Sequence, residues 1–253
     1  MTELPQGTVA FLFTDVERSP RLWESHREAM ARAVEHHFTI LDDAITAHRG
    51  IRFKAVGDAV QAAFPTVPNA IAAAIGAQLA LGREEWGEPG PLRVRMAVHA
   101  GEATPQDGDY LAPALNRLAR VLGAGYGEQI LLTETARTLA VPLPDGYAAL
   151  DLGTHRLRDL LEAQHIFQLA GPGLRRDFPP LSSLDRLPNN LPAQPSPLLD
   201  RESELTAIAT KLITPGSRLL TLLGPGGSAR PGSACRRRPM SSTTSRMGCG
   251  GFR

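Results

Sequence analysis

TVAFLFT, at positions 8–14, is an unbroken run of apolar and β-branched residues, and Asp15 follows it directly. Such a run predicts a β-strand. Pro20 then stands where the first turn of a helix is expected, with Ser19 as the N-cap residue. The strand is therefore expected to end in a carboxylate that lies just before a helix start.

The residues after this strand alternate between helical and extended patterns. Apolar residues at three- and four-residue steps predict a long helix over 19–48, ended by Gly50; they are Leu22, Met30, Val34, Phe38, Leu41 and Ile45. Further expected elements are strands over 51–56 and 60–64 joined by a turn at Gly57-Asp58, a helix over 69–85, a strand over 92–102, a helix over 113–122, a strand over 129–132, a short helix over 134–139 and short strands up to residue 169. The order β, α, β, β, α, β, with extra C-terminal α and β elements, predicts an α+β fold with a ferredoxin-like sheet and helices on one face.

Composition excludes several classes of protein. The 253 residues are 42% hydrophobic, which suits a globular chain. No apolar run reaches the ~20 residues of a membrane span, no secretory signal is visible, and only two cysteines are present. We therefore expect a cytoplasmic protein without membrane association.

The net charge of +1 is unevenly distributed. Residues 229–253 carry six arginines and no acidic residue, so the other 228 residues carry 21 basic and 26 acidic side chains. A mildly acidic body does not suit a general nucleic-acid binder, and no helix-turn-helix pattern is visible. Direct nucleic-acid binding is not expected.

Two carboxylates are candidates for a metal site. Asp15 follows the first strand, and Asp58 lies in the turn of an expected hairpin. Carboxylates at strand ends and turns of one sheet can converge on a hard divalent cation, while a helix N-terminus beside them can bind phosphates. Aspartate is also common in ordinary turns, so the pair alone leaves a purely structural role open.

Lysine is rare in this chain. Of the 27 basic residues only Lys54 and Lys211 are lysines, and the rest are arginines. Arginine and lysine differ in shape and hydrogen-bonding geometry, so Lys54 is a candidate for a chemical role, with chance placement as the alternative.

Four segments occur in order along the chain: FLFTDVERSP (11–20), FKAVGDAVQAAF (53–64), VRMAVHAGEA (94–103) and DGDYLAPALNRLAR (107–120). Together they resemble the signatures of class III adenylate/guanylate cyclase catalytic domains, over roughly residues 6–170. The resemblance implies that Asp15 and Asp58 bind two metal ions, Mg²⁺ or Mn²⁺. It also implies that Lys54 and Asp109 read the purine base.

The same resemblance assigns Asn116 and Arg120 to ribose orientation and transition-state stabilisation. Their spacing of four places them on one helix face. All six positions carry the residue types of an ATP-using enzyme, which implies conversion of ATP to 3′,5′-cyclic AMP and pyrophosphate. A guanylate cyclase conflicts with Lys54 and Asp109.

In this family the site forms between two subunits. Asp15 and Asp58 would come from one protomer and the other four residues from its partner, so the resemblance implies a homodimer with two equivalent sites. A further phosphate-binding cation is expected in HRLRDL (155–160), where Arg156 and Arg158 are both candidates. The seven histidines show no metal-ligand spacing, and His36-His37 is expected to be a pair on a helix surface.

The bacterial relatives read FTDIEGST where this chain reads FTDVERSP, and two of the departures change the chemistry of the loop. Arg18 replaces a glycine that lets the backbone approach phosphates, and Pro20 replaces a threonine and removes an N–H group. Arg18 either crowds the loop or adds a phosphate contact. These changes favour, as the alternative function, a weak or inactive cyclase-like module that dimerises or senses nucleotide.

The C-terminal part of the chain is expected to be of a different kind. We expect a cyclase domain over 1–170, a proline-rich linker over 171–198, the start of a P-loop ATPase domain over 199–228 and a disordered tail over 229–253. The P-loop is broken, because Ala229, Arg230 and Pro231 stand where Gly, Lys and Ser/Thr belong.

A one-base frameshift explains this break. Restoring one guanine before a permitted coding of residues 229–236 changes the reading to Gly-Lys-Thr-Arg-Leu-Gly-Leu-Gln, a proper P-loop continuation. The chain is then expected to be the head of a larger actinobacterial regulator. The alternative is an arginine-rich tail that binds nucleic acid.

Overall fold

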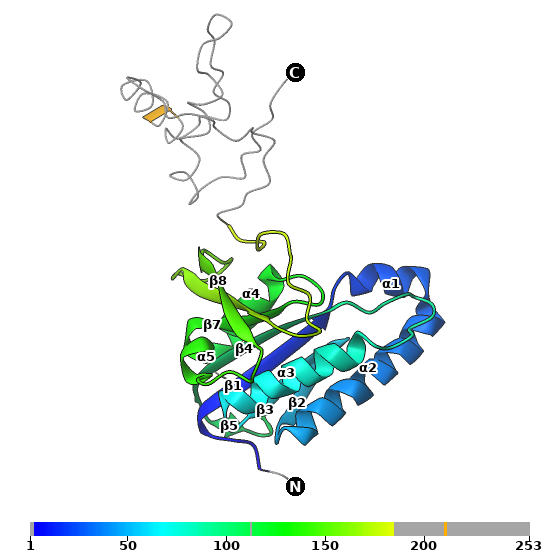
Figure 1. The fold of residues 1–253 in the computed structure, drawn as a ribbon, viewed down its shortest axis with the longest axis horizontal. Coiled ribbons are helices and arrows are strands. Elements are labelled where there is room, and N and C mark those ends of the chain that lie inside the picture. Colours follow the sequence, from blue (N-terminus) through cyan, green and yellow to red (C-terminus); the bar gives the residue numbers. More distant parts are fainter. Residues whose placement is uncertain (1–2, 112, 185–209, 212–253) are drawn as a thin grey trace, which may run out of the picture. The chain divides into compact units, whose positions relative to one another are not determined.

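The computed structural model describes residues 3–111, 113–184 and 210–211. In chain order the elements are β1 (Gly7–Val16), α1 (Ser19–Ser25), α2 (Arg27–Ala47), β2 (Ile51–Val56), β3 (Ala59–Phe64), α3 (Val67–Leu81), β4 (Val94–Ala103), β5 (Pro105–Gln106), β6 (Asp109–Tyr110), α4 (Pro113–Ala124), β7 (Ile130–Thr133), α5 (Glu134–Leu139), β8 (Ala148–His155) and β9 (Gln164–Ala170). Figure 1 shows α2 and α3 lying side by side across the strands.

One sheet of seven strands forms the centre of the fold, in the order β2-β3-β1-β4-β7-β9-β8. All neighbours are antiparallel except β4 and β7. The strand predicted from residues 8–14 is confirmed as β1, which lies between β3 and β4. In the β1–β4 pairing Asp15 lies opposite Arg95.

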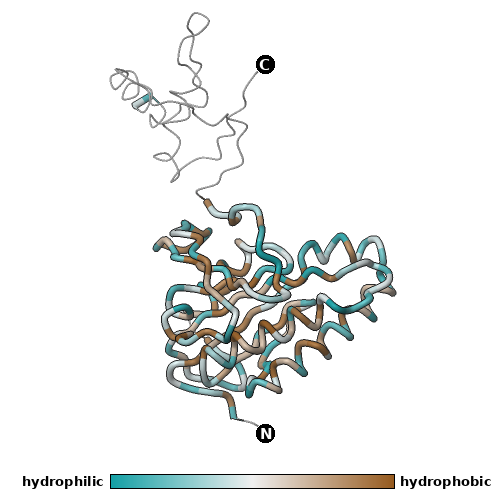
Figure 2. Tube along the Cα trace, viewed as in Figure 1, coloured by the Kyte–Doolittle hydropathy of each residue, from teal (hydrophilic) through white to brown (hydrophobic). Residues whose placement is uncertain are grey.

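Both faces of the sheet are covered, so the expectation of helices on one face is wrong. Alternate residues of β1 point to opposite sides: Ala10 and Leu12 pack with α2 and α3, whereas Val9, Phe11 and Phe13 pack with α4. Because side chains alternate between the two faces of a strand, the single apolar run of β1 contributes to a hydrophobic core on each side of the sheet. Figure 2 shows the contrast between α3, hydrophobic along most of its length, and α2, which mixes polar and apolar residues.

Two helix boundaries differ from the sequence expectations. The predicted helix over 19–48 is two helices, because His26 leaves the helical region at φ −141 and ψ 51. The predicted helix over 69–85 is α3, which ends at Leu81. There Gly82 follows the last turn and the Trp86 indole N–H donates to the Leu81 carbonyl at 3.2 Å, which satisfies an orphan acceptor of the helix end.

Residues 171–183 pack against the sheet domain, which differs from the linker expected there. The compact unit runs from Met1 to Ser183. Leu181 is buried with the α4 side of the core, and the Ser182 amide donates to the Ala124 carbonyl at 2.9 Å. The segment therefore contacts the domain through one buried leucine and a main-chain hydrogen bond.

The second unit comprises residues 184–253, of which the structure describes Leu184 and the helical pair Thr210 and Lys211. The expected P-loop fragment (199–228) and tail (229–253) therefore lie outside the described residues, apart from this pair. Within the described part of the chain, no helix combines the length and hydrophobicity needed to cross a bilayer.

Candidate nucleotide and metal site

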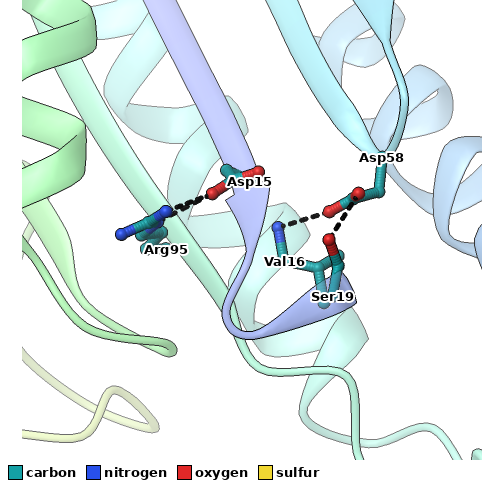
Figure 3. Close-up of polar contacts among 5 residues, drawn as sticks. All are labelled: Asp15, Val16, Ser19, Asp58 and Arg95. Atoms are coloured by element: carbon teal, nitrogen blue, oxygen red, sulfur yellow. Dashed lines mark hydrogen bonds and ion pairs between the residues drawn. The ribbon is translucent and has the colours of Figure 1, made fainter. Parts of the chain in front are cut away.

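Asp58 is held by the loop that follows β1. The turn between β2 and β3 presents it, as expected from Gly57-Asp58, and its side chain is only 8% exposed. The Val16 amide donates to Oδ2 at 3.0 Å and the Ser19 hydroxyl donates to Oδ1 at 2.8 Å (Figure 3). Ser19 is therefore not the predicted helix cap: Arg18 occupies the N-cap position, Ser19 is the first residue of α1, and its hydroxyl donates to Asp58.

Asp15 lies on the other side of the same strand end. Its Oδ2 accepts from Nε of Arg95 at 2.9 Å and from Nη2 of the same guanidinium (Figure 3). Both N–H groups converge on one oxygen, so these contacts leave Oδ1 available. The side chains of both residues are about one quarter exposed, which makes this a partly screened ion pair.

His37 contacts the same turn from α2. The expectation that His36-His37 is a surface pair holds for His36, which is exposed and pairs with Glu84 at 2.9 Å. For His37 it is wrong, because the side chain is 0% exposed and its Nε2 donates to the Asp58 carbonyl at 3.2 Å. Burial lowers the pKa of His37 to about 4, so the ring is neutral at pH 7.

Lys54 and Asp109 are in direct contact. Nζ of Lys54, on β2, donates to Oδ2 of Asp109, on β6. This hydrogen bond from Lys54 is the main cause that lowers the pKa of the Asp109 carboxyl. An edge-to-face cluster of Phe11, Phe53 and Tyr110 packs beside the pair, with ring centroids 5.0 to 6.1 Å apart. A cation, a carboxylate and aromatic rings therefore occur together at one edge of the domain.

Asn116 and Arg120 lie on α4, and both are exposed. Arg120 forms an ion pair with Asp159 at 2.9 Å, in which both partners are close to half exposed or more. A pair this exposed is weak, about 0–1 kcal/mol, so it does not fix the guanidinium. Asp159 follows Arg156 and Arg158, which places the HRLRDL segment next to the α4 arginine.

The six predicted residues thus fall into three groups. Asp15 and Asp58 flank the end of β1, Lys54 and Asp109 contact each other, and Asn116 and Arg120 share the exposed side of α4. No hydrogen bond or ion pair among the described residues joins one group to another.

Sequence reasoning missed Arg95 and the role of Ser19, and it misplaced His37. A signal for His37 was present, because positions 34, 37 and 41 follow the helix-face spacing and Val34 and Leu41 are both buried. Arg95 depends on the register between β1 and β4, which local sequence does not contain.

The carboxylates at the β1 end suit a metal that is shared with a ligand. Among the described residues, no three His, Cys, Asp or Glu side chains cluster closely enough to hold an ion. Mg²⁺ characteristically uses one or two carboxylates and completes its shell with waters and substrate phosphates. Oδ1 of Asp15 and both carboxylate oxygens of Asp58 keep lone pairs beyond their hydrogen bonds, so the two residues fit such an ion.

Fold and site together define a class of protein: an α+β domain with carboxylates at the end of a central strand and a lysine–aspartate pair at another edge. The family described as the adenylate and guanylate cyclase catalytic domain matches residues 1–141. The chain belongs to this family.

Relatives in sequence agree with this assignment. An uncharacterised protein of Mycobacterium tuberculosis is 34% identical over 206 residues, which covers 80% of this chain and 70% of that protein. The adenylate cyclase of Lachancea kluyveri is 35% identical over 154 residues, but this chain spans only 8% of its length.

Solved structures share the fold. An adenylate cyclase from Trypanosoma brucei in its monomeric state superimposes with a TM-score of 0.65 at 25% identity, covering 74% of this chain and 97% of that one. The guanylyl cyclase Cya2 superimposes with a TM-score of 0.55 at 21% identity, covering 66% of this chain and 95% of that one. Because adenylate and guanylate cyclases share this fold, the fold alone does not select the base.

Proposed function

We propose that this chain is an adenylate cyclase that converts ATP to 3′,5′-cyclic AMP and pyrophosphate. The observation that carries the proposal is the contact between Lys54 and Asp109. It places a donor and an acceptor side by side, as adenine requires: the ammonium donates to a ring nitrogen and the carboxylate accepts from the 6-amino group. Guanine carries a 6-oxo group instead, which reverses that pattern.

Asp15 and Asp58 are the residues that would hold the metal ions. Bound Mg²⁺ or Mn²⁺ supplies charge neutralisation for the triphosphate and makes the ribose 3′-hydroxyl more acidic. In the reaction the 3′-oxygen loses its proton to solvent and bonds to the α-phosphorus in line, and the bond to the β-phosphate oxygen breaks, so that pyrophosphate leaves with the electron pair. Asn116 orients the ribose, and Arg120 donates to the charge that develops on the phosphorus oxygens.

We propose that the site is shared between two copies of the chain. Asp15 and Asp58 act from one protomer, whereas Lys54, Asp109, Asn116 and Arg120 act from its partner. In support, Asp15 and Asp58 make their hydrogen bonds with Arg95, Val16 and Ser19. Lys54 and Asp109 pair with each other, and Arg120 pairs with Asp159.

Replacing the metal carboxylate tests this mechanism. In the full chain, Asp58→Ala is expected to lower cyclic AMP formation by about 100-fold or more, because the metal supplies several kcal/mol of charge stabilisation. Asp43→Ala, which removes an exposed carboxylate of α2, is the matched control and is expected to retain activity. Normal turnover in Asp58→Ala would contradict the mechanism.

Base selection has its own test. Lys54→Ala is expected to reduce the preference for ATP over GTP, measured as the ratio of kcat/KM, by about 10-fold or more. Arg52 lies two residues earlier on β2 and pairs with Asp42 at 3.0 Å, so Arg52→Ala is the control that keeps the preference. An unchanged ratio in Lys54→Ala would remove Lys54 from base recognition.

A second function is favoured by one observation at the metal loop. Arg18 adopts a left-handed conformation, with φ 60 and ψ 24, where relatives carry glycine. An arginine side chain at this loop would crowd phosphates bound there, which favours a module that binds nucleotide and dimerises without turnover. Binding of ATP without cyclic AMP formation distinguishes it from the enzyme.

The wider setting remains a proposal from the sequence. We infer a cytoplasmic protein and the head of a larger regulator whose P-loop domain is interrupted by a frameshift. Resequencing the locus tests the frameshift, since an unchanged sequence without a P-loop in the other frame would contradict it.

A further inference from the structure

His37 is a buried polar side chain at a position that an apolar side chain could fill. It lies at the centre of α2 between Val34 and Leu41, and its side chain is 0% exposed. Its Nδ1 is buried and has no hydrogen-bond partner among the described residues. An orphan buried acceptor costs about 1–3 kcal/mol, which leucine or phenylalanine at this position would avoid.

Within the described part of the chain, the ring makes its polar contact with the turn between β2 and β3 that carries Asp58. Nε2 donates to the main-chain carbonyl of Asp58 at 3.2 Å, which fixes the tautomer with the proton on Nε2. On the opposite side of the same residue, the Val16 amide and the Ser19 hydroxyl hold the two carboxylate oxygens. Asp58 is therefore fixed through its main chain from α2 and through its side chain from the loop after β1.

We propose that His37 is a positioning residue that holds the Asp58 turn in the orientation needed to bind the divalent cation. The inference rests on the proposed function in one respect, the assignment of Asp58 as a metal ligand. His37 acts through the Asp58 carbonyl and does not touch the metal or the nucleotide. Residues that orient metal ligands in this way typically change metal affinity or activity by about 10–100-fold when they are replaced.

The test measures Mn²⁺ binding to the full chain by electron paramagnetic resonance, in the presence of a non-cleavable ATP analogue. His37→Phe fills the same space without the donor and is expected to weaken Asp58-dependent Mn²⁺ binding by about 10-fold. His37→Gln carries an amide N–H at the position of Nε2 and is expected to recover most of the affinity.

His99→Phe is the matched control. His99 is also a buried histidine, but its Nδ1 contacts the Thr133 hydroxyl at 2.8 Å on the α4 side of the sheet. A loss of Mn²⁺ affinity in His37→Phe that is absent in His99→Phe separates positioning from a general loss of packing.

Two results would overturn the inference. If His37→Phe binds Mn²⁺ with an affinity within twofold of wild type, the Asp58 turn keeps its orientation without His37. If the wild-type chain shows no Asp58-dependent Mn²⁺ binding, the turn is not a metal site. Neither readout requires turnover. A chain that makes no cyclic AMP but loses Mn²⁺ affinity in His37→Phe would refute the cyclase proposal and leave this inference standing.

Discussion

Arg18 is a non-glycine residue in the left-handed region, with φ 60, directly before α1. An L-residue in this conformation loses about 1–2 kcal/mol relative to glycine, part of which is offset because glycine makes the unfolded chain more flexible. We expect Arg18→Gly to raise the free energy of unfolding by about 0.5–1 kcal/mol. Urea unfolding followed by circular dichroism measures this change.

Arg21→Gly is the control for that substitution. Arg21 lies inside α1, where glycine is a poor helix former, so a loss of about 1 kcal/mol is expected. If Arg18→Gly destabilises the chain as much as Arg21→Gly does, the guanidinium of Arg18 makes a compensating interaction.

The lowered pKa of buried His99 predicts that the free energy of unfolding depends on pH. Burial, and to a smaller extent the nearby Arg117 guanidinium, lower its pKa to about 4. The unfolded chain takes up the proton near pH 6.5, whereas the folded chain does not until about pH 4, so folding stability falls as the pH drops between these values.

Urea unfolding at pH 7 and pH 5 measures the effect. We expect wild type to lose about 1–2 kcal/mol more than His99→Phe between these pH values. His37 contributes equally to both chains and cancels in the comparison. Equal losses would mean that His99 is protonated in the folded state.

At the scale of single residues, some of the candidate site could be predicted from the sequence. Asp58 in its turn and Asp15 at the strand end follow from local patterns, because turn chemistry and strand composition are local. The partners Ser19 and Arg95 do not, since they depend on which strands and loops become neighbours. The prediction treated His36 and His37 as one surface pair, but adjacent positions on a helix face different directions, and only His36 is exposed.

At the scale of structural elements, residues 171–183 form a segment that packs against the cyclase domain. Leu181 is 2% exposed within the core on the α4 side, so Leu181→Ala is expected to cost about 2–4 kcal/mol of unfolding free energy. Leu161→Ala removes a fully exposed leucine and is expected to change stability by less than about 0.5 kcal/mol. Thermal unfolding of the two variants compares them.

Equal stability of the two variants would mean that this segment detaches from the domain. If the segment packs as described, a shortened cyclase domain needs to extend to about residue 184.

Most strands and helices were predictable at this scale, because the periodicities at 8–14, 51–64 and 94–98 are local and strong. The break at His26 and the packing of 171–183 were not. Both depend on tertiary contacts, as does the placement of α4 on the face of the sheet opposite α2 and α3.

At the scale of the whole molecule, a shared site predicts complementation between two inactive chains. Asp58→Ala lacks a metal ligand and Arg120→Ala lacks the transition-state cation, so each alone is expected to be inactive. In an equal mixture half of the dimers are mixed, and one of their two sites is intact, which gives about one quarter of wild-type activity. No recovery in the mixture would place the whole site within one chain.

The most direct test of the proposed function is cyclic nucleotide formation by the full chain, supplied with ATP or GTP and Mn²⁺ over a series of protein concentrations. We predict cyclic AMP from ATP, little cyclic GMP from GTP, and a specific activity that rises as the dimer forms. A folded, dimeric chain that forms no cyclic nucleotide at any concentration, or that forms cyclic GMP in preference, would contradict the proposal.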